Sequence, residues 1–166
     1  MSVERCSECG FDGGNWTDTQ ALVRLAELPA LWSQAIEGIG PADLLRRPIP
    51  EMWSIAEYTD HVRETTFGMR LVLEMAIAEP GIDLGDPPEP RFDPAPRPID
   101  ASHALAMFEQ EVRQLSEKLA ATESERWSSH ATISGEVVDV HWVARHAVHD
   151  VSHHLGDVEK LRASLR

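Results

Sequence analysis

The stretch VDVHWVARHAVHDVSHHLGDVEKLRASL, residues 138–165, decides the fold that the sequence predicts. Its apolar side chains recur at intervals of three and four residues, which is the period of one face of an α-helix. They are Val140, Ala144, Val151, Leu155 and Val158. Four of the chain's eight histidines fall within residues 146–154. We therefore expect one long helix here, with one face in a core and the histidines at the margin of that face.

Three further helices are predicted before it, over about residues 17–37, 54–78 and 102–122. Each carries leucine, valine or aromatic residues at helical spacing. Ser54 and Glu57 read as the two ends of a capping box, which marks the start of the second helix. Pro29 lies inside the first helix and is expected to kink or split it, because proline lacks a backbone N–H.

The connections between these helices indicate a bundle. Seven prolines fall between Pro80 and Pro98, so this segment predicts a long crossover loop of coil between the second and third helices. Residues 127–139 carry two short β-prone stretches around Gly135, which predict a small hairpin and no further β-structure. The expected fold is all-α: a four-helix bundle of up-down-down-up topology. Residues 1–16 form an N-terminal arm and residues 17–166 the bundle domain.

The apolar positions of the four helices predict the core and one outer surface. The side chains expected inside the bundle are Leu25, Trp32, Val62, Met69, Phe108, Leu115, Val151 and Leu155. Leu71 and Met75 lie off the main apolar stripe of the second helix. They extend an apolar surface outward and predict a homodimer contact.

Composition excludes several classes of function. The formal net charge of −13 argues against nucleic-acid binding, which needs clustered lysine and arginine to neutralise phosphates. No apolar run approaches the roughly 18–20 residues that span a bilayer, so no membrane partner is expected. The N-terminus lacks a basic and then apolar signal peptide. We expect a cytoplasmic protein that acts on a small molecule.

The histidines predict a metal centre. His149 and His153 are one helical turn apart, so their imidazoles can reach the same point in space. His61, at the edge of the second helix's apolar stripe, can add a third nitrogen, because bundle metal sites draw on facing helices. Three ligands leave a coordination position for water or substrate. The alternatives are a solvated polar face for the pair and a hydrogen-bonded core histidine for His61.

Two motifs resemble the DinB-like superfamily. WSIAEYTDHVRE, residues 53–64, is similar to that family's second-helix motif, and HDVSHHLGD, residues 149–157, is similar to its fourth-helix motif HExxHHxGQ. Carried over to this chain, the family's metal triad falls on His61, His149 and His153. Asp150 stands in place of the usual glutamate and Asp157 in place of glutamine, both at positions that can support the ligands.

The resemblance implies a protein that binds a divalent metal ion, and it implies a general class of reaction. Members of the family include metal-dependent thiol transferases and a maleylpyruvate isomerase that use low-molecular-weight thiols such as mycothiol or bacillithiol. Zn²⁺ or Ni²⁺ is the expected ion, because imidazole prefers borderline metals. A thiol cofactor is expected beside it. The alternative is a non-catalytic metal-binding or interaction protein whose histidines hold two helices together.

HDVSH also resembles the HExxH motif of zinc proteases. That mechanism needs a glutamate as general base and a third ligand further along the chain. Asp150 is one methylene shorter than glutamate, and only thirteen residues follow His153. We do not expect a protease.

Cys6-Ser7-Glu8-Cys9-Gly10 resembles one zinc knuckle, whose glycine allows a tight turn beneath a metal. A sealed knuckle needs two more ligands, and the chain has no second pair of cysteines. Three interpretations stay open. Cys6 and Cys9 could share a metal with histidines such as those of the last helix, act as a redox pair, or lie unused in a frayed arm.

The remaining histidines and two nearby carboxylates are expected to lie outside the metal site or to support its ligands. His154 is turned about 100° from His153 around the helix and is not expected to join the same site. Glu57 and Asp157 are the nearest candidates to hold the non-ligating nitrogens of His61 and His153. His103 and His130 are expected at the surface.

Overall fold

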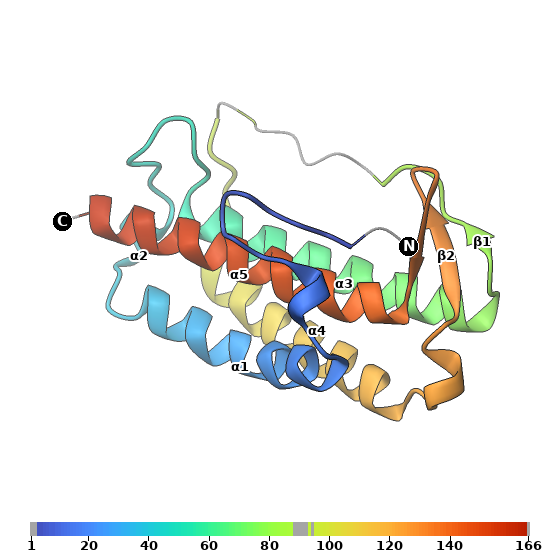
Figure 1. The fold of residues 1–166 in the computed structure, drawn as a ribbon. Coiled ribbons are helices and arrows are strands. Elements are labelled where there is room, and N and C mark those ends of the chain that lie inside the picture. The colour runs from blue at the N-terminus through green and yellow to red at the C-terminus, as the bar shows by residue number, and fades with distance from the viewer. Residues whose placement is uncertain (1–2, 88–92, 94, 166) are drawn as a thin grey trace.

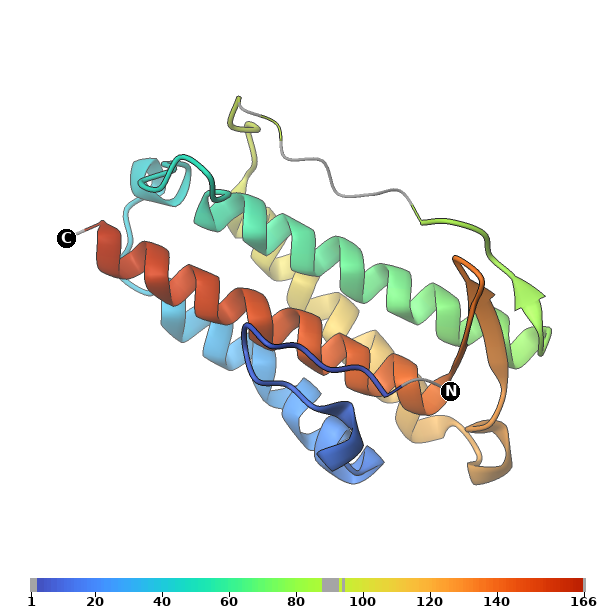
Figure 2. The same ribbon diagram turned by 45° about the horizontal axis from the view of Figure 1, so that its top comes forward.

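The computed structural model describes residues 3–87, 93 and 95–165. Four long helices form a bundle: α1 (Asp18–Ile36), α3 (Ile55–Ala78), α4 (Ala101–Ala121) and α5 (Val140–Ser164). Shorter helices are η1 (Gly13–Asn15), α2 (Pro41–Leu44) and η2 (Ser124–Arg126). α1 and α5 run in one direction and α3 and α4 in the other (Figures 1 and 2). The predicted up-down-down-up bundle is confirmed.

The parallel pair α3 and α4 explains the long connection between them. The end of α3 and the start of α4 lie at opposite ends of the bundle (Figure 1), so the connection has to span its length. α3 packs against both α4 and α5, while α1 covers the other sides of the same two helices. The facing surfaces of α3 and α5 are therefore neighbours, and this pair carries the three histidines predicted as metal ligands.

Helix boundaries follow from local hydrogen bonds that the sequence predicts. The Ser54 hydroxyl accepts the N–H of Glu57 at 3.2 Å, and a Glu57 carboxylate oxygen accepts the N–H of Ser54 at 2.8 Å. This confirms the capping box of α3. Thr17 and Gln20 form the same arrangement at α1. α1 continues through Pro29 as one helix, so the split suggested by the sequence does not occur; packing of the helix into the bundle outweighs the lost hydrogen bond.

The core lies between the four helices and is almost the predicted one. Seven of the eight predicted side chains are buried, and Met69 is partly buried against them. Trp32, the largest fully buried side chain, donates its indole N–H to the Thr59 hydroxyl at 3.0 Å. No helix among the described residues is long and apolar enough to cross a membrane.

A small sheet at one end of the bundle differs from expectation. The predicted hairpin is present as β2 (His130–Ile133) and β3 (Glu136–Asp139), turned at Gly135 with φ of 78°. A third strand, β1 (Ile82–Asp83), pairs in parallel with β2. The segment Pro80–Pro98 is therefore not all coil, and its residues 88–92 and 94 lie outside the described part. A two-residue strand carries no readable alternation, so only pairing with β2 defines it.

Residues 3–16 of the N-terminal arm fold against α5, so the interpretation of a frayed arm is not supported for them (Figure 2). An isolated antiparallel bridge joins Arg5 and Asp12, and η1 follows it. Phe11 stacks on His149 with ring centroids 4.5 Å apart. The arm therefore covers the outward flank of the histidine-rich helix.

Glu57 belongs to a buried ion pair and does not support His61. Its carboxylate accepts hydrogen bonds from the Arg47 guanidinium, at 2.8 Å from Nε, and from the backbone N–H of Arg97. Burial opposes the charge of Glu57, but these hydrogen bonds outweigh burial and lower its pKa to about 2. The expected contact with His61 is corrected: the pair instead fastens the loop before α3 to its first turn.

We expect Glu57→Gln to lower the free energy of unfolding by about 3 kcal/mol near neutral pH, because Arg47 stays buried without its counter-charge. The folded-state pKa is depressed, so this contribution is complete above the unfolded pKa of about 4.5 and is lost as pH falls toward 2. Urea unfolding at pH 7 and pH 4 measures it. Glu27→Gln, which removes an exposed pair with Arg24, should cost less than about 1 kcal/mol. Equal losses in both variants would contradict the assignment.

The homodimer stays a prediction, now with a defined surface. Phe67, Leu71 and Met75 are 40%, 37% and 39% exposed and follow one another by one turn along α3. We expect Leu71→Ser with Met75→Ser to shift a dimer to monomer in multi-angle light scattering. Val23→Ser, at an exposed apolar residue of α1, is the control. A wild-type monomer at micromolar concentration would rule this contact out.

Candidate metal centre

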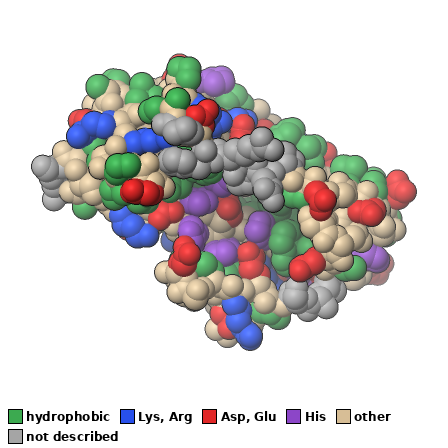
Figure 3. Space-filling model, turned by 90° about the horizontal axis from the view of Figure 1, so that it is seen from above, with side chains coloured by type: hydrophobic (Ala, Val, Ile, Leu, Met, Phe, Trp, Pro, Cys, Tyr) green, Lys and Arg blue, Asp and Glu red, His purple; other side chains and the backbone are tan. Residues whose placement is uncertain are grey.

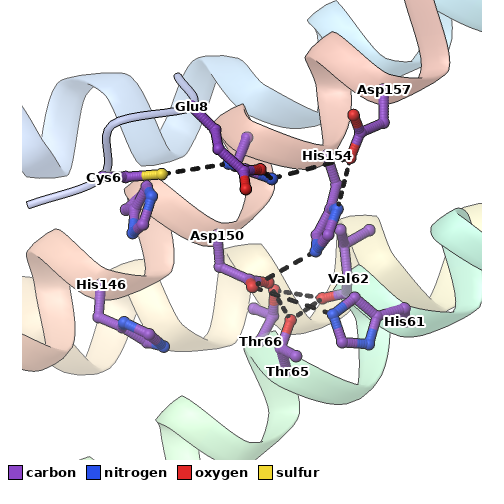
Figure 4. A network of polar contacts seen from close by, with 12 residues as sticks. Cys6, Glu8, His61, Val62, Thr65, Thr66, His146, Asp150, His154 and Asp157 are labelled. Carbon is purple, nitrogen blue, oxygen red and sulfur yellow. Dashed lines mark hydrogen bonds and ion pairs between the residues drawn. The ribbon is translucent and has the colours of Figure 1, made fainter. Parts of the chain in front are cut away.

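Two histidines and a carboxylate meet where α3 faces α5. His61 comes from the second turn of α3, and Asp150 and His154 lie one turn apart on α5. An Asp150 oxygen lies 3.9 Å from His61 Nε2 and 3.7 Å from His154 Nε2 (Figure 4). One ligand atom from each residue lies within 4.8 Å of the others. This set is called the α3–α5 group below.

Surrounding side chains hold the outer edges of this group. The Thr65 hydroxyl donates to the second Asp150 oxygen at 2.7 Å, which leaves the first oxygen turned toward the histidines (Figure 4). His154 Nδ1 lies 3.1 Å from an Asp157 oxygen. A carboxylate at Nδ1 favours the tautomer with its proton there and its lone pair on Nε2. The lone pair of His154 is thus directed to Asp150 and His61.

Aromatic rings enclose the group on the side of α3. Trp53 packs on His61 and Tyr58 on His154, with centroid distances of 5.0 and 5.1 Å. Burial lowers the pKa of His61, so its ring is neutral at neutral pH and keeps a lone pair. Burial also raises the pKa of Tyr58 to about 12, so its hydroxyl stays protonated. Two imidazoles and a carboxylate fit a divalent first-row ion such as Zn²⁺.

A second group lies on the outward flank of α5, beneath the arm. Cys6, Cys9, His149 and His153 each offer one ligand atom within 4.8 Å of the others. Cys6 Sγ lies 3.6 Å from His153 Nδ1. Hydrogen bonds from the Cys9 N–H, the His149 side chain and the Glu8 N–H lower the pKa of the Cys6 thiol to about 6, while burial raises the pKa of Cys9. Both cysteines are free thiols.

Glu4 connects the arm to two histidines of α5. One of its oxygens lies 2.7 Å from His149 Nδ1 and 3.0 Å from His146 Nδ1. Burial opposes its ionisation, but the two imidazoles outweigh it and lower the pKa of Glu4. Seen from above, histidine and acidic side chains gather in a hollow across the middle of this face (Figure 3).

The three predicted ligands are not brought together. His149 and His153 share the group with Cys6 and Cys9, whereas His61 lies with Asp150 and His154; no group among the described residues combines His61 with His149 or His153. His153 and His154 do occur together in a further group with Asp157, so the expectation that His154 is turned too far around the helix to share a site with His153 is not supported. Metal binding by His61, His149 and His153 stays a prediction.

Sequence reasoning missed that Asp150 and His154 are also one turn apart. His154 follows Val151 by three residues and precedes Val158 by four, and both valines are buried. That spacing was a readable signal, because it places His154 on the face turned to the core. Asp157 supports His154 more closely than His153, at 3.1 against 3.9 Å. No local sequence pattern could indicate the role of Glu4, because the histidines that it contacts lie more than 140 residues away.

Comparison with known proteins places this arrangement in a family. A sequence profile of the DinB superfamily matches residues 24–158. The chain belongs to the DinB superfamily. The match includes α3, and α5 as far as residue 158, and therefore the α3–α5 group, but it begins after the arm that carries Cys6 and Cys9.

A solved structure shares the fold. YfiT from Bacillus subtilis, described as a probable metal-dependent hydrolase with an unusual four-helix bundle topology, superposes with a TM-score of 0.66 at 14% sequence identity. The alignment covers 88% of this chain and 87% of YfiT. At this identity the likeness concerns the fold alone. No curated protein matches the chain significantly.

Proposed function

We propose that this DinB superfamily protein is a metal-dependent enzyme whose divalent ion, Zn²⁺ or Ni²⁺, is held by His61, Asp150 and His154. The observation that carries the proposal is the convergence of these three donors from two facing helices, with Asp150 within 3.9 Å of each imidazole. The description of YfiT as a probable metal-dependent hydrolase supports a catalytic ion in this fold. The proposal replaces His149 and His153 of the predicted triad by Asp150 and His154.

Three protein ligands suit catalysis better than a sealed structural site, because they leave a position for a small molecule. An ion held there would lower the pKa of a coordinated thiol or water and so supply a nucleophile at neutral pH. Thr65 fixes the orientation of Asp150, and Asp157 fixes that of His154. Trp53 and Tyr58 keep the α3 side of the group apolar, which strengthens electrostatic interactions inside it.

The reaction that we propose is transfer of a low-molecular-weight thiol to an electrophile, or a thiol-assisted isomerisation. It rests on the family's thiol-dependent members, and mycothiol or bacillithiol in the cytoplasm is the proposed cofactor. Tyr58 could contribute a hydrogen bond to the second reactant, because its hydroxyl stays protonated. The rival is a purely structural metal protein, and the Cys6/Cys9 group, which offers four ligands, is the observation that favours it.

The test compares zinc-loaded wild type with Asp150→Asn and Glu159→Gln. Each variant removes one negative charge from α5, but Glu159 is exposed and lies outside the α3–α5 group. We expect Asp150→Asn to weaken zinc binding more than about 100-fold, because loss of a ligand exceeds the 10–100-fold cost of losing a group that only supports one. Competition with a chromophoric chelator measures the affinity.

The same variants test catalysis. Consumption of 1-chloro-2,4-dinitrobenzene by mycothiol or bacillithiol should accelerate with the wild type and Glu159→Gln, and fall to the uncatalysed rate with Asp150→Asn. Far-UV circular dichroism checks that each variant is folded. A rate that survives both chelation and Asp150→Asn would contradict the enzyme proposal, and unaltered zinc affinity in Asp150→Asn would contradict the ligand assignment.

A further inference from the structure

The arm places its two thiols on the same side of a tight turn. The N–H of Cys6 donates to the Phe11 carbonyl at 2.9 Å, and the N–H of Gly10 donates to the Cys6 carbonyl at 3.0 Å. Gly10 has a φ of 75°, a left-handed conformation that a residue with a side chain adopts at a cost. The turn therefore has the geometry of a zinc knuckle, in which two cysteines spaced by two residues approach one ion.

α5 supplies a complementary pair of imidazoles beneath this turn. His149 and His153 are one helical turn apart, and their ligand atoms lie within 4.8 Å of each other and of both sulfurs. Tetrahedral zinc with Zn–S of about 2.3 Å and Zn–N of about 2.0–2.1 Å separates a sulfur from a nitrogen by about 3.6 Å. The distance between Cys6 Sγ and His153 Nδ1 is 3.6 Å. These two atoms, one sulfur and one nitrogen, are therefore already spaced like two ligands of one zinc ion.

The hydrogen bonds of His149 leave one nitrogen for a ligand role. Glu4 lies 2.7 Å from Nδ1, and a carboxylate at that position favours the proton on Nδ1 and the lone pair on Nε2. Nε2 is buried and has no hydrogen bond of normal geometry among the described residues, and the side chain that interacts with His149 besides Glu4 is the Cys6 thiol. The buried nitrogen therefore lies beside a sulfur, and an ion shared with the two sulfurs would give it a strong partner.

We propose that Cys6, Cys9, His149 and His153 form a second metal site, a structural zinc site that fastens the N-terminal arm to α5. Two thiolates and two imidazoles complete a closed tetrahedron, unlike the open α3–α5 group with its two histidines and one carboxylate. Glu4 orients His149 from one side, and Phe11 stacks on its ring from another. The site would hold the arm as a fixed edge of the histidine-lined hollow.

Thiolate ligands give this site a signature that the α3–α5 group cannot produce. Cobalt bound to cysteine sulfur absorbs strongly in the near ultraviolet through charge transfer, whereas nitrogen and oxygen ligands do not give this band. We expect Co²⁺-reconstituted wild type to show the band together with intense visible bands of tetrahedral cobalt. Cys6→Ser with Cys9→Ser should abolish the charge-transfer band, and His149→Gln or His153→Gln should weaken or displace it.

Matched variants separate this site from its neighbours. Ser7→Ala changes one of the two residues between the cysteines and should keep the band. His146→Gln removes the other imidazole near Glu4 and should also keep it, because His146 lies outside the cysteine group. Asp150→Asn should keep it as well, while it empties the α3–α5 group. Circular dichroism of the cysteine double variant should retain its helical signal, because the buried core residues come from the long helices and β3, while Phe11 and Trp16 of the arm only pack against that core.

The zinc content of purified wild type, measured by elemental mass spectrometry, completes the test. Two ions per chain are expected, one lost in the cysteine double variant and the other in Asp150→Asn. A single ion with thiolate ligands would support this site and contradict the enzyme proposal. A single ion lost only in Asp150→Asn, or a Cys6–Cys9 disulfide in the freshly purified protein, would overturn the second site.

Discussion

The arrangement of both donor groups depends on how α5 is rotated about its own axis. Burial of Val151, Leu155 and Val158 fixes this rotation, because turning the helix would expose these side chains and bring polar ones into the core. Once the rotation is fixed, each remaining position on α5 has a defined neighbour. Asp150 and His154 meet α3, whereas His149 and His153 meet the N-terminal arm.

The two donor groups follow from a one-residue offset on one helix. The pairs 149/153 and 150/154 each span one turn, and adjacent residues differ by about 100° around the axis. The helix therefore presents donors in two directions, and each direction finds a partner of different chemistry: an imidazole on α3 in one case and two thiols of the arm in the other. In our account this separates a catalytic ion with an open position from a structural ion with a closed one.

The sequence predicts most of the fold because helical periodicity and capping are local. The four helices, the capping box of Ser54 and Glu57, and nearly all of the core could be read directly. β1 could not, because two residues next to Pro80 carry no pattern before they pair with β2. The partner of Glu57 was also hidden, since Arg47 reaches it from an irregular loop.

The sequence predicts which residue types form the candidate site and on which helices they lie, but not which of these residues share an ion. The histidine pair was chosen by spacing alone, although the apolar face of α5 already placed His154 nearer the core than His149. Cys6 and Cys9 could be recognised as a knuckle but not assigned partners, because contacts such as that between Cys6 and His153 join residues 147 positions apart. Such distant contacts depend on the folded bundle and leave no trace in local sequence.

The most direct measurement of the central claim is an anomalous difference map at the zinc absorption edge from crystals of the zinc-loaded protein. The account predicts a peak between His61, Asp150 and His154, separate from any density near the cysteines. A peak that joins His61 to His149 and His153, or the lack of any peak beside Asp150, would contradict it.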